Sequence, residues 1–365
     1  MMIDSITREA IAKCLALDIP FALCLLPDSD ESTFFAAAPA ADNCDLTVIG
    51  EAIDRFDGFL FSDFEVNQTI RATGITKILT AADILSLDAH AAICSDVVPR
   101  RLNETTTREA YYEQADRIIR SFGSDKEKAV LSKVTAIKSE VHPVDVAERY
   151  FAQHPSCFRY LYFTPECGIW FGASPELVLD YDCNTGKFIS MSLAGTRAVA
   201  DSDSVWDTKN SLEHDMVTDY ILDVLHRHGF ATGDPEMKNV RFGHIEHLCH
   251  IIGACGNEKL SRLLPDLYPT PAFCGFPRDA AWQLIRTVET HRRYCYGGFA
   301  GIKSGGRTRL YVNMRCAFTH KADKDGRFTY NLFGGGGLTC RSDREAEWME
   351  AEAKVSSLKQ IITQN

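Results

Sequence analysis

The sequence predicts an α+β fold with large antiparallel sheets. Helical and strand-like patterns mix along all 365 residues, without the steady strand–helix–strand succession of a doubly wound parallel sheet. The hydrophobic content of 45% is enough for a sizeable core and argues against a disordered chain. This length is typical of about two domains, although one large domain also fits. We expect one compact domain, in which residues 1–105 are an N-terminal α/β scaffold and residues 106–365 carry the chemistry.

The first 105 residues contain no group of side chains suited to catalysis or ligand binding. Apolar residues at helical spacing predict a helix over residues 6–17 and a short one over residues 80–88. Short apolar runs predict strands over residues 21–26, 33–38 and 58–64. This part of the chain is therefore expected to serve as scaffold.

A lysine opens the first strand of the second region. An amphipathic helix is expected over residues 106–122, and a strand over residues 128–134 begins at Lys128. A lysine in this position is usually a solvated edge residue. One that points with apolar neighbours into a site can instead act as a base. Both interpretations are open on this pattern alone.

A kinked strand and a glycine follow. Residues 159–163 and 167–173 predict a hairpin, and Glu176 lies where Ser-Pro-Glu breaks its second strand, a place where a side chain can be re-aimed. A further strand over residues 187–193 is closed by Ala-Gly-Thr. Gly195 there would let backbone N–H groups meet a ligand carboxylate, and a plain β-turn is the alternative.

A glutamate lies on the apolar face of a predicted helix. Residues 211–229 have strong helical spacing, and Glu213 shares a face with Val217, Tyr220 and Val224. A carboxylate on the buried side needs a cation, a metal or a hydrogen bond. Glu213 is therefore a candidate functional residue.

Residues 243–255 contain several side chains of the types that bind zinc. These are His244, His247, Cys249, His250 and Cys255. The stretch alternates like a strand, which places His247 and Cys249 on one face and His244 and His250 on the other. A tetrahedral zinc site needs ligands that converge. We therefore disfavour structural zinc and expect His247 to contact a ligand.

Two strands and a glycine run follow near the end of the chain. Residues 294–302 and 308–318 are expected to pair as strands, with Arg315 in the second. A last strand over residues 328–333 leads into four glycines, 334–337. Glycines allow a backbone to approach a ligand closely.

The glycines lead into an acidic helix. Ser342-Asp343 predicts its N-cap, and Glu347, Glu350 and Lys354 share one face of it. Taken alone, this is explained by acidic residues that suit a helix N-terminus and by a common i,i+4 ion pair. The rest of the chain must decide whether the face is functional.

Charge and cysteine content limit the class of protein. The net charge of -11 argues against a nucleic-acid partner. The 13 cysteines are scattered and form no Cys-x-x-Cys pair. The start of the chain lacks the apolar core of a signal peptide, and no apolar run reaches the roughly 18 residues of a membrane span. We expect a reduced, cytoplasmic protein with no membrane partner.

Eight short motifs occur in one order over about residues 125–360. They are Lys128-Ala-Val-Leu-Ser, Gly172-Ala-Ser-Pro-Glu-Leu, Leu193-Ala-Gly-Thr, Glu213-His-x-x-Val, His247-Leu, Pro269-Thr-Pro-Ala-x-x-Gly-x-Pro-Arg, Arg315 before Ala317, and GGGG…EWMEAEAK. Each motif is weak alone, but eight in order are highly specific. In these motifs the chain resembles the chorismate-utilising enzymes, and within them the isochorismate synthases.

The resemblance implies an α+β fold in which two large antiparallel sheets pack as a sandwich with helices outside, and it implies a Mg²⁺ cofactor. It implies that Lys128 is the base that activates water and that Glu176 is the acid for the departing hydroxyl. Glu213 and Glu350 would be metal ligands, and Glu347 would support them or act through water. The residues implied in substrate binding are Gly195, Thr196, His247, Ala272, Arg315, Gly335 and Lys354.

The resemblance also implies the reaction, in which water adds at C2 of chorismate and the C4 hydroxyl is lost. The ammonia-using anthranilate synthases resemble this chain but lack a lysine at the position of Lys128. Aminodeoxychorismate synthase has a lysine where this chain has Ala194. Water is therefore the expected nucleophile.

Three outcomes are compatible with chorismate binding. The leading one is release of isochorismate, for menaquinone or siderophore synthesis, and the proline-rich loop from Pro269 favours it. The others are a salicylate synthase that goes on to eliminate pyruvate, and an inactive chorismate-binding protein, which the intact motifs disfavour. The expected partner is the small molecule chorismate, and the expected state is a monomer or weak homodimer.

Overall fold

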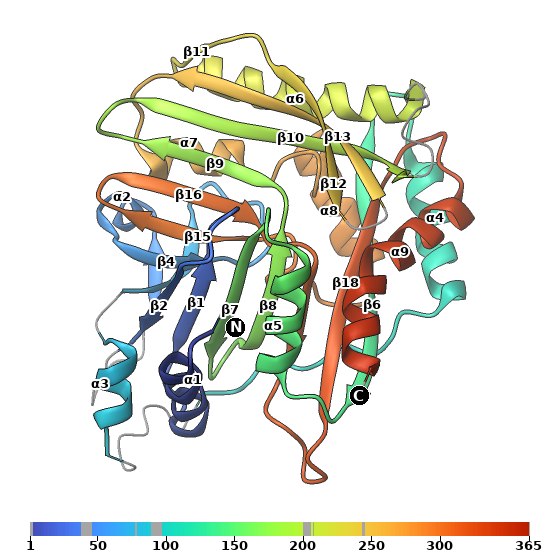
Figure 1. Ribbon diagram of the computed structural model, residues 1–365. Helices are drawn as coiled ribbons and strands as arrows, with labels where there is room; N and C mark the ends of the chain where they lie inside the picture. The colour runs from blue at the N-terminus through green and yellow to red at the C-terminus, as the bar shows by residue number, and fades with distance from the viewer. Residues whose placement is uncertain are drawn as a thin grey trace.

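Two large antiparallel sheets form the body of the protein (Figure 1). The computed structural model describes residues 3–37, 46–76, 79–88, 97–199, 206, 208–242 and 245–364. The eight-stranded sheet has the order β14 (Gly275–Phe276), β6 (Lys128–Ser139), β18 (Phe328–Leu338), β17 (Cys316–Thr319), β8 (Gly168–Ser174), β7 (Phe158–Thr164), β1 (Phe21–Leu25) and β2 (Ser32–Ala36).

The second sheet has ten strands. Its order is β11 (Ala231–Thr232), β13 (Ile245–Cys255), β10 (Lys187–Ala198), β9 (Leu177–Asp182), β16 (Arg307–Val312), β15 (Phe299–Ser304), β4 (Gly58–Phe61), β5 (Arg71–Ile75) and β3 (Thr47–Ile49), and β12 (Glu236–Phe242) also pairs with β13. These antiparallel sheets confirm the predicted fold class.

Helices cover the outer faces of the sheets. They are α1 (Ser5–Leu17), α2 (Ala52–Arg55), α3 (Ala81–Ser86), α4 (Arg108–Ser121), α5 (Pro143–Gln153), α6 (Thr208–Arg227), α7 (Leu260–Leu267), α8 (Arg278–Val288) and α9 (Arg344–Thr363). In Figure 1, α6 lies across β10 and β13, and α9 runs beside β18. Among the described residues, no helix combines the length and the apolar character that a membrane span requires.

Alternating side chains along the strands create two apolar cores. In β1, Ala22 and Cys24 belong to the core between the sheets, whereas Phe21, Leu23 and Leu25 pack with the side chains of α1, α5 and α9. This is the period-2 pattern of a strand buried on both faces. The N-terminal third contributes to both sheets, since β1 pairs with β7 and β4 pairs with β15.

Two expectations about the glycines were wrong. The strand β10 does not close at Ala-Gly-Thr but continues to Ala198 through a bulge, in which Gly195 has a φ of +75°. The glycines 334–337 do not follow the last strand but lie inside β18, where they pair with β6. Glycine is unfavourable in a strand interior unless another group must approach closely, so the position of this run points to a site at β18.

The placement of Arg315 also differs from the expectation. The strand predicted over residues 308–318 is divided into β16 of the ten-stranded sheet and β17 of the eight-stranded sheet. Arg315 lies in the connection between them, with a φ of +50°. Its side chain is therefore presented from the place where the chain crosses from one sheet to the other.

Candidate active site

A small pocket lies between the glycines of β18, the bulge of β10, the start of α6 and the face of α9. The residues that line it are Val130, Glu176, Leu193, Ala194, Gly195, Thr196, Glu213, His247, Ala272, Phe273, Tyr296, Met314, Arg315, Phe333, Gly334, Gly335, Gly336, Gly337, Glu350 and Lys354. Its volume is about 50 Å³, which holds one or two water molecules. Charged side chains that pair with one another fill the rest of the space.

The floor of the pocket is backbone because β18 carries glycines there. A Cβ atom at Gly337 would lie 2.4 Å from Glu213 Oε1 and 2.4 Å from Lys128 Cε. A Cβ atom at Gly336 would lie 2.7 Å from Glu347 Oε2. At these distances the ends of the three charged side chains would have to move to admit a Cβ atom, so the glycines provide the space in which the charged groups meet as they do here.

Lys128 and Glu213 form a buried ion pair beside this floor. Lys128 Nζ lies 2.8 Å from Glu213 Oε1, although the angle of the contact is not that of a hydrogen bond. Lys128 is only 1% exposed. The glutamate on the apolar side of α6 therefore has the cationic partner that its position required.

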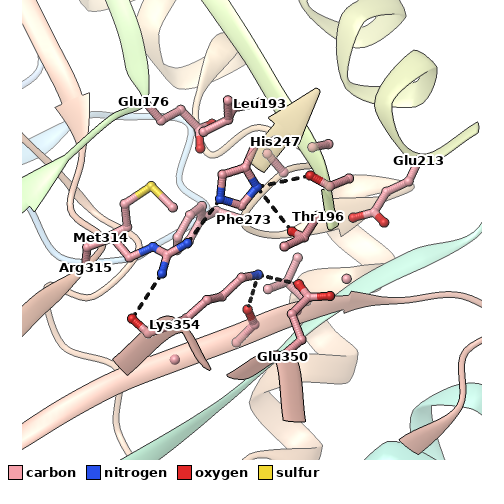
Figure 2. Close-up of a pocket in the computed structure, with 18 of the residues that line it drawn as sticks. Glu176, Leu193, Thr196, Glu213, His247, Phe273, Met314, Arg315, Glu350 and Lys354 are labelled. Atoms are coloured by element: carbon pink, nitrogen blue, oxygen red, sulfur yellow. Dashed lines mark hydrogen bonds and ion pairs between the residues drawn. The ribbon is translucent and has the colours of Figure 1, made fainter. Parts of the chain in front are cut away.

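A second lysine–glutamate pair lies along α9. Lys354 Nζ donates to Glu350 Oε1 at 2.6 Å and to the carbonyl of Gly335 at 2.8 Å. The backbone carbonyl of Lys354 accepts a hydrogen bond from Arg315 Nη1 at 3.0 Å. Figure 2 shows these three side chains on the same side of the cavity.

Arg315 is buried without a carboxylate partner among the described residues. Its side chain is enclosed by the ring of Phe242, 4.6 Å from the guanidinium carbon, and by His247. Its Nε has no hydrogen-bond partner. A buried guanidinium without a counterion is costly, so this corner of the pocket is suited to an anionic ligand.

The contacts of His247 determine its tautomer. Nδ1 lies 3.0 Å from the carbonyl of Gly195, which only accepts, so Nδ1 carries the proton. Nε2 is then an acceptor and takes a hydrogen bond from Arg315 Nη2 at 3.1 Å. Thr196 Oγ1 lies 3.2 Å from Nδ1. Burial and then the charges of Arg315 and Lys354 lower the pKa of His247 to about 3, so the ring is neutral.

Glu176 lies across the cavity from Glu350 and Lys354 (Figure 2). Its backbone carbonyl accepts from Val312 N–H at 3.0 Å, which ties the kink after β8 to β16. Burial raises the pKa of Glu176 to about 8, against the opposing charges of Lys128 and Lys354. Near neutral pH the side chain is a protonated acid that can donate a proton.

Sequence comparison identifies the family. Residues 68–360 match the chorismate binding enzyme family. The chain belongs to this family. It is 30% identical to isochorismate synthase EntC from Escherichia coli K12 over 285 residues, which are 73% of this chain and 70% of EntC. It is 25% identical to isochorismate synthase MenF from Haemophilus influenzae over 322 residues, which are 84% of this chain and 72% of MenF.

Solved structures of this family share the fold. DhbC from Bacillus anthracis, described as a 2,3-dihydroxybenzoate-specific isochorismate synthase, superposes with a TM-score of 0.73 at 18% identity, covering 98% of this chain and 100% of DhbC. MenF from Escherichia coli, described as a menaquinone-specific isochorismate synthase, superposes with a TM-score of 0.69 at 19% identity. The match covers 99% of this chain and 91% of MenF. The predicted family is confirmed.

The structure brings the residues implied by the family resemblance to one place. The candidate acid, the two candidate metal ligands and the seven candidate substrate-binding residues were all implied by the motifs, and all ten line the pocket. Lys128 does not line it directly but reaches it through Glu213. Glu347 lies behind Gly336, where its Oε1 accepts from Ser342 Oγ at 2.8 Å.

The acidic corner of the pocket fits a divalent cation. Glu213, Glu347 and Glu350 carry hard oxygen donors to the space left by Gly336 and Gly337. Mg²⁺ is usually held by one or two protein carboxylates, with water and substrate completing its shell. In the described ranges, no three His, Cys, Asp or Glu side chains group closely enough for a full metal cage. The residues therefore fit a cation that protein carboxylates hold only in part.

The zinc-like residues of β13 have separate environments. His247 faces the pocket, whereas His250 Nδ1 lies 2.9 Å from His214 Nε2 of α6 on the other face of the sheet. Cys249 is buried and Cys255 is exposed. His244 lies outside the described residues.

Sequence reasoning missed the apolar wall of the pocket. This wall consists of Val130, Leu193, Phe273, Tyr296, Met314 and Phe333. Tyr296 stacks on Phe333 with 5.1 Å between ring centroids. Phe273 could have been found, because it follows Ala272 in the proline-rich loop. Tyr296 carried no signal, because it lies in a segment expected to be an ordinary strand, whereas β15 begins only at Phe299.

Proposed function

We propose that the protein converts chorismate to isochorismate. Water adds at C2 of the ring and the hydroxyl at C4 leaves. Support comes from the similarity to EntC and MenF, which are named isochorismate synthases. The observation that carries the proposal is the buried carboxyl group of Glu176, whose pKa is raised to about 8 by burial and which lines the same pocket as Glu213, the ion-pair partner of Lys128.

The pocket can hold an anionic substrate by two cations. Chorismate carries two carboxylates, and Arg315 and Lys354 would bind one of them. His247 fixes the guanidinium of Arg315 because its neutral Nε2 accepts from Nη2. Gly195, Ala272 and Gly335 would bound the ring, and Thr196 beside His247 could hydrogen-bond to it. The anion would displace Lys354 from Glu350, because the pocket is otherwise filled.

Lys128 and Glu176 have opposite tasks in the reaction. Lys128 takes a proton from water as the oxygen bonds to C2, the ring double bonds shift, and the C4–O bond breaks. Glu176 gives its proton to the leaving oxygen, which departs as water. Lys128 Nζ lies 2.8 Å from Glu213 Oε1, so this carboxylate would hold the amine at the edge of the pocket.

Glu213 and Glu350 would hold Mg²⁺, with Glu347 supporting them. When bound, the ion would neutralise a substrate carboxylate and withdraw electron density from the ring. The observation that supports this role is the set of carboxylates gathered around the space at Gly336 and Gly337.

Product identification tests the proposal. Purified protein with chorismate and MgCl₂ is expected to give isochorismate in ¹H NMR spectra, and the Lys128→Met variant is expected to give none while keeping the wild-type circular dichroism spectrum. Absence of isochorismate from the wild-type reaction would contradict the proposed function. Near-normal turnover by Lys128→Met would contradict the role proposed for Lys128. A lactate-dehydrogenase-coupled assay tests the salicylate synthase alternative, because pyruvate released as fast as chorismate is consumed would establish it.

A further inference from the structure

A buried ion pair behind the pocket wall joins two segments of the candidate active site. Glu289 follows the last residue of α8, and Arg293 lies four residues further along the chain. The side chains of both residues are only 4% exposed. Neither of them lines the pocket, and neither has a task in the proposed reaction. Their contacts nevertheless lead to the strand that carries Lys128.

Two hydrogen bonds hold the pair together. Arg293 Nε donates to Glu289 Oε2 at 2.8 Å, and Arg293 Nη2 donates to Glu289 Oε1 at 2.5 Å. The ring of Phe64 lies 4.5 Å from the central carbon of the guanidinium. Burial opposes the ionisation of Glu289, but the charges of Arg293 and His291 and the hydrogen bonds to the carboxylate together lower its pKa. The pair is therefore ionised, and its bidentate contact fixes the orientation of the guanidinium.

Arg293 also binds two backbone carbonyls of the pocket wall. Its Nη2 donates to the carbonyl of Val130 at 2.5 Å, and its Nη1 donates to the carbonyl of Phe273 at 3.2 Å. Val130 is the third residue of β6, Phe273 belongs to the proline-rich loop, and both line the pocket. A guanidinium is suited to this arrangement because its donors form a fixed planar fork, whereas a lysine ammonium is a single point of attachment.

Further hydrogen bonds attach β6 to the same surroundings. Glu289 Oε1 accepts from the N–H and from the hydroxyl of Ser132 in β6, both at 2.8 Å. The N–H of Val130 donates to the carbonyl of Cys274 at 2.9 Å. One edge of β6 pairs along its length with β18, whereas the edge towards the loop pairs only with the two-residue strand β14. The ion pair therefore supplements the weaker edge of the strand that Lys128 begins.

We propose that Arg293 and Glu289 are positioning residues for Lys128. The pair sets the distance between β6 and the wall formed by the proline-rich loop, against which the substrate ring lies. When the pair is broken, the two cations of the pocket still hold the substrate carboxylate, but the ring meets the lysine in fewer productive orientations. The effect on catalysis rests on the proposed function, whereas the effect on the two backbone segments does not.

Steady-state kinetics of the Arg293→Lys variant test this role. The lysine keeps the charge but cannot bind the carboxylate in a bidentate manner and also reach both carbonyls. The kcat is expected to fall at least tenfold, and the KM for chorismate is expected to change less than threefold. The matched control is Arg159→Lys, because Arg159 is also fully buried and donates to two backbone carbonyls, those of Leu26 and Ser29. The control should unfold at a lower urea concentration than the wild type but keep the wild-type kcat.

A second variant and a second measurement complete the test. Glu289→Gln keeps the size of the side chain and removes its charge, and it should lower kcat by a similar factor. The double variant Arg293→Lys/Glu289→Gln should lose no more than the worse single variant, because the two side chains act as one unit. In hydrogen exchange of the full chain, residues 128–134 and 272–275 should exchange at least threefold faster in Arg293→Lys than in the wild type, and at the wild-type rate in Arg159→Lys.

Three results would overturn the proposal. They are a kcat near that of the wild type in Arg293→Lys and Glu289→Gln, an equal fall of kcat in Arg159→Lys, and unchanged exchange in both segments. If Arg293→Lys does not fold, the kcat and the exchange of Glu289→Gln decide by the same criteria. A wild-type protein that makes no isochorismate would remove the proposed function, and faster exchange of the two segments in Arg293→Lys would still show that the ion pair holds them together.

Discussion

Replacing Glu176 by glutamine should make the folded protein less sensitive to pH as well as inactive. Burial raises the pKa of this carboxyl from 4.5 to about 8. Between these pH values the folded protein keeps a proton that the unfolded chain releases, so stability is highest below pH 4.5 and is lost as the pH rises towards 8. Each pKa unit is worth about 1.4 kcal/mol. Raising the pH from 5 to 7 should therefore cost the wild type about 2 to 3 kcal/mol through this group.

The assay is urea unfolding of wild type and E176Q at pH 5, 6 and 7. Every other titrating group is common to both proteins, so the difference between their stability curves isolates Glu176. A matched variant, Glu104→Gln, removes an exposed carboxylate and should leave the wild-type pH dependence intact. Parallel curves for wild type and E176Q would refute the inference that a neutral carboxylic acid is buried in the pocket. The kcat of E176Q should also fall by about 10² to 10⁴, because an amide does not supply the proton.

Three further outcomes are expected. The catalytic rate of the wild type should fall as the pH rises through about 8, because Glu176 then loses the proton it donates, and this falling limb in a pH–rate profile should be absent from the residual activity of E176Q. Gly337→Ala should lower turnover and cost about 1 to 3 kcal/mol in urea unfolding, since its Cβ would displace the ends of the paired Lys128 and Glu213 side chains, whereas Gly253→Ala, with no atom within 4 Å of the added Cβ, should behave as wild type. EDTA should abolish activity and Mg²⁺ restore it, and calorimetry should show weaker Mg²⁺ binding by Glu350→Gln; undiminished activity in EDTA would count against the metal.

Local chemistry made much of the fold predictable. The last helix was found from its cap and its helix-forming residues, and in α9 the side chain of Asp343 accepts from Ala346 N–H at 2.9 Å. The hairpin of β7 and β8 was found from two apolar runs around a turn. Such features depend on neighbours in sequence, which a pattern records directly.

The candidate site depends on contacts that are distant in sequence. Arg315 and His247 lie 68 residues apart, and neither strand pattern shows that one orients the other. The last strand was expected to end before the four glycines, because glycine is unfavourable in strands, but the need for space beside Lys128 and Glu213 overrode that preference. The resemblance in eight ordered motifs located these residues, which the patterns of the separate strands and helices did not connect.

The glycine stretch of β18 also changes how substitutions in this protein should be judged. These residues contribute volume and no side-chain functional group. A variant with a side chain at Gly334 or Gly335 would keep every charged group of the pocket and still distort it, because the added Cβ would lie 2.5 Å from the carbonyl oxygen of Ala351 or 2.7 Å from that of Leu131. A comparison of the polar residues alone would not detect that the site of such a variant is altered. For a protein of this kind, the inventory of a working site includes the positions at which nothing projects.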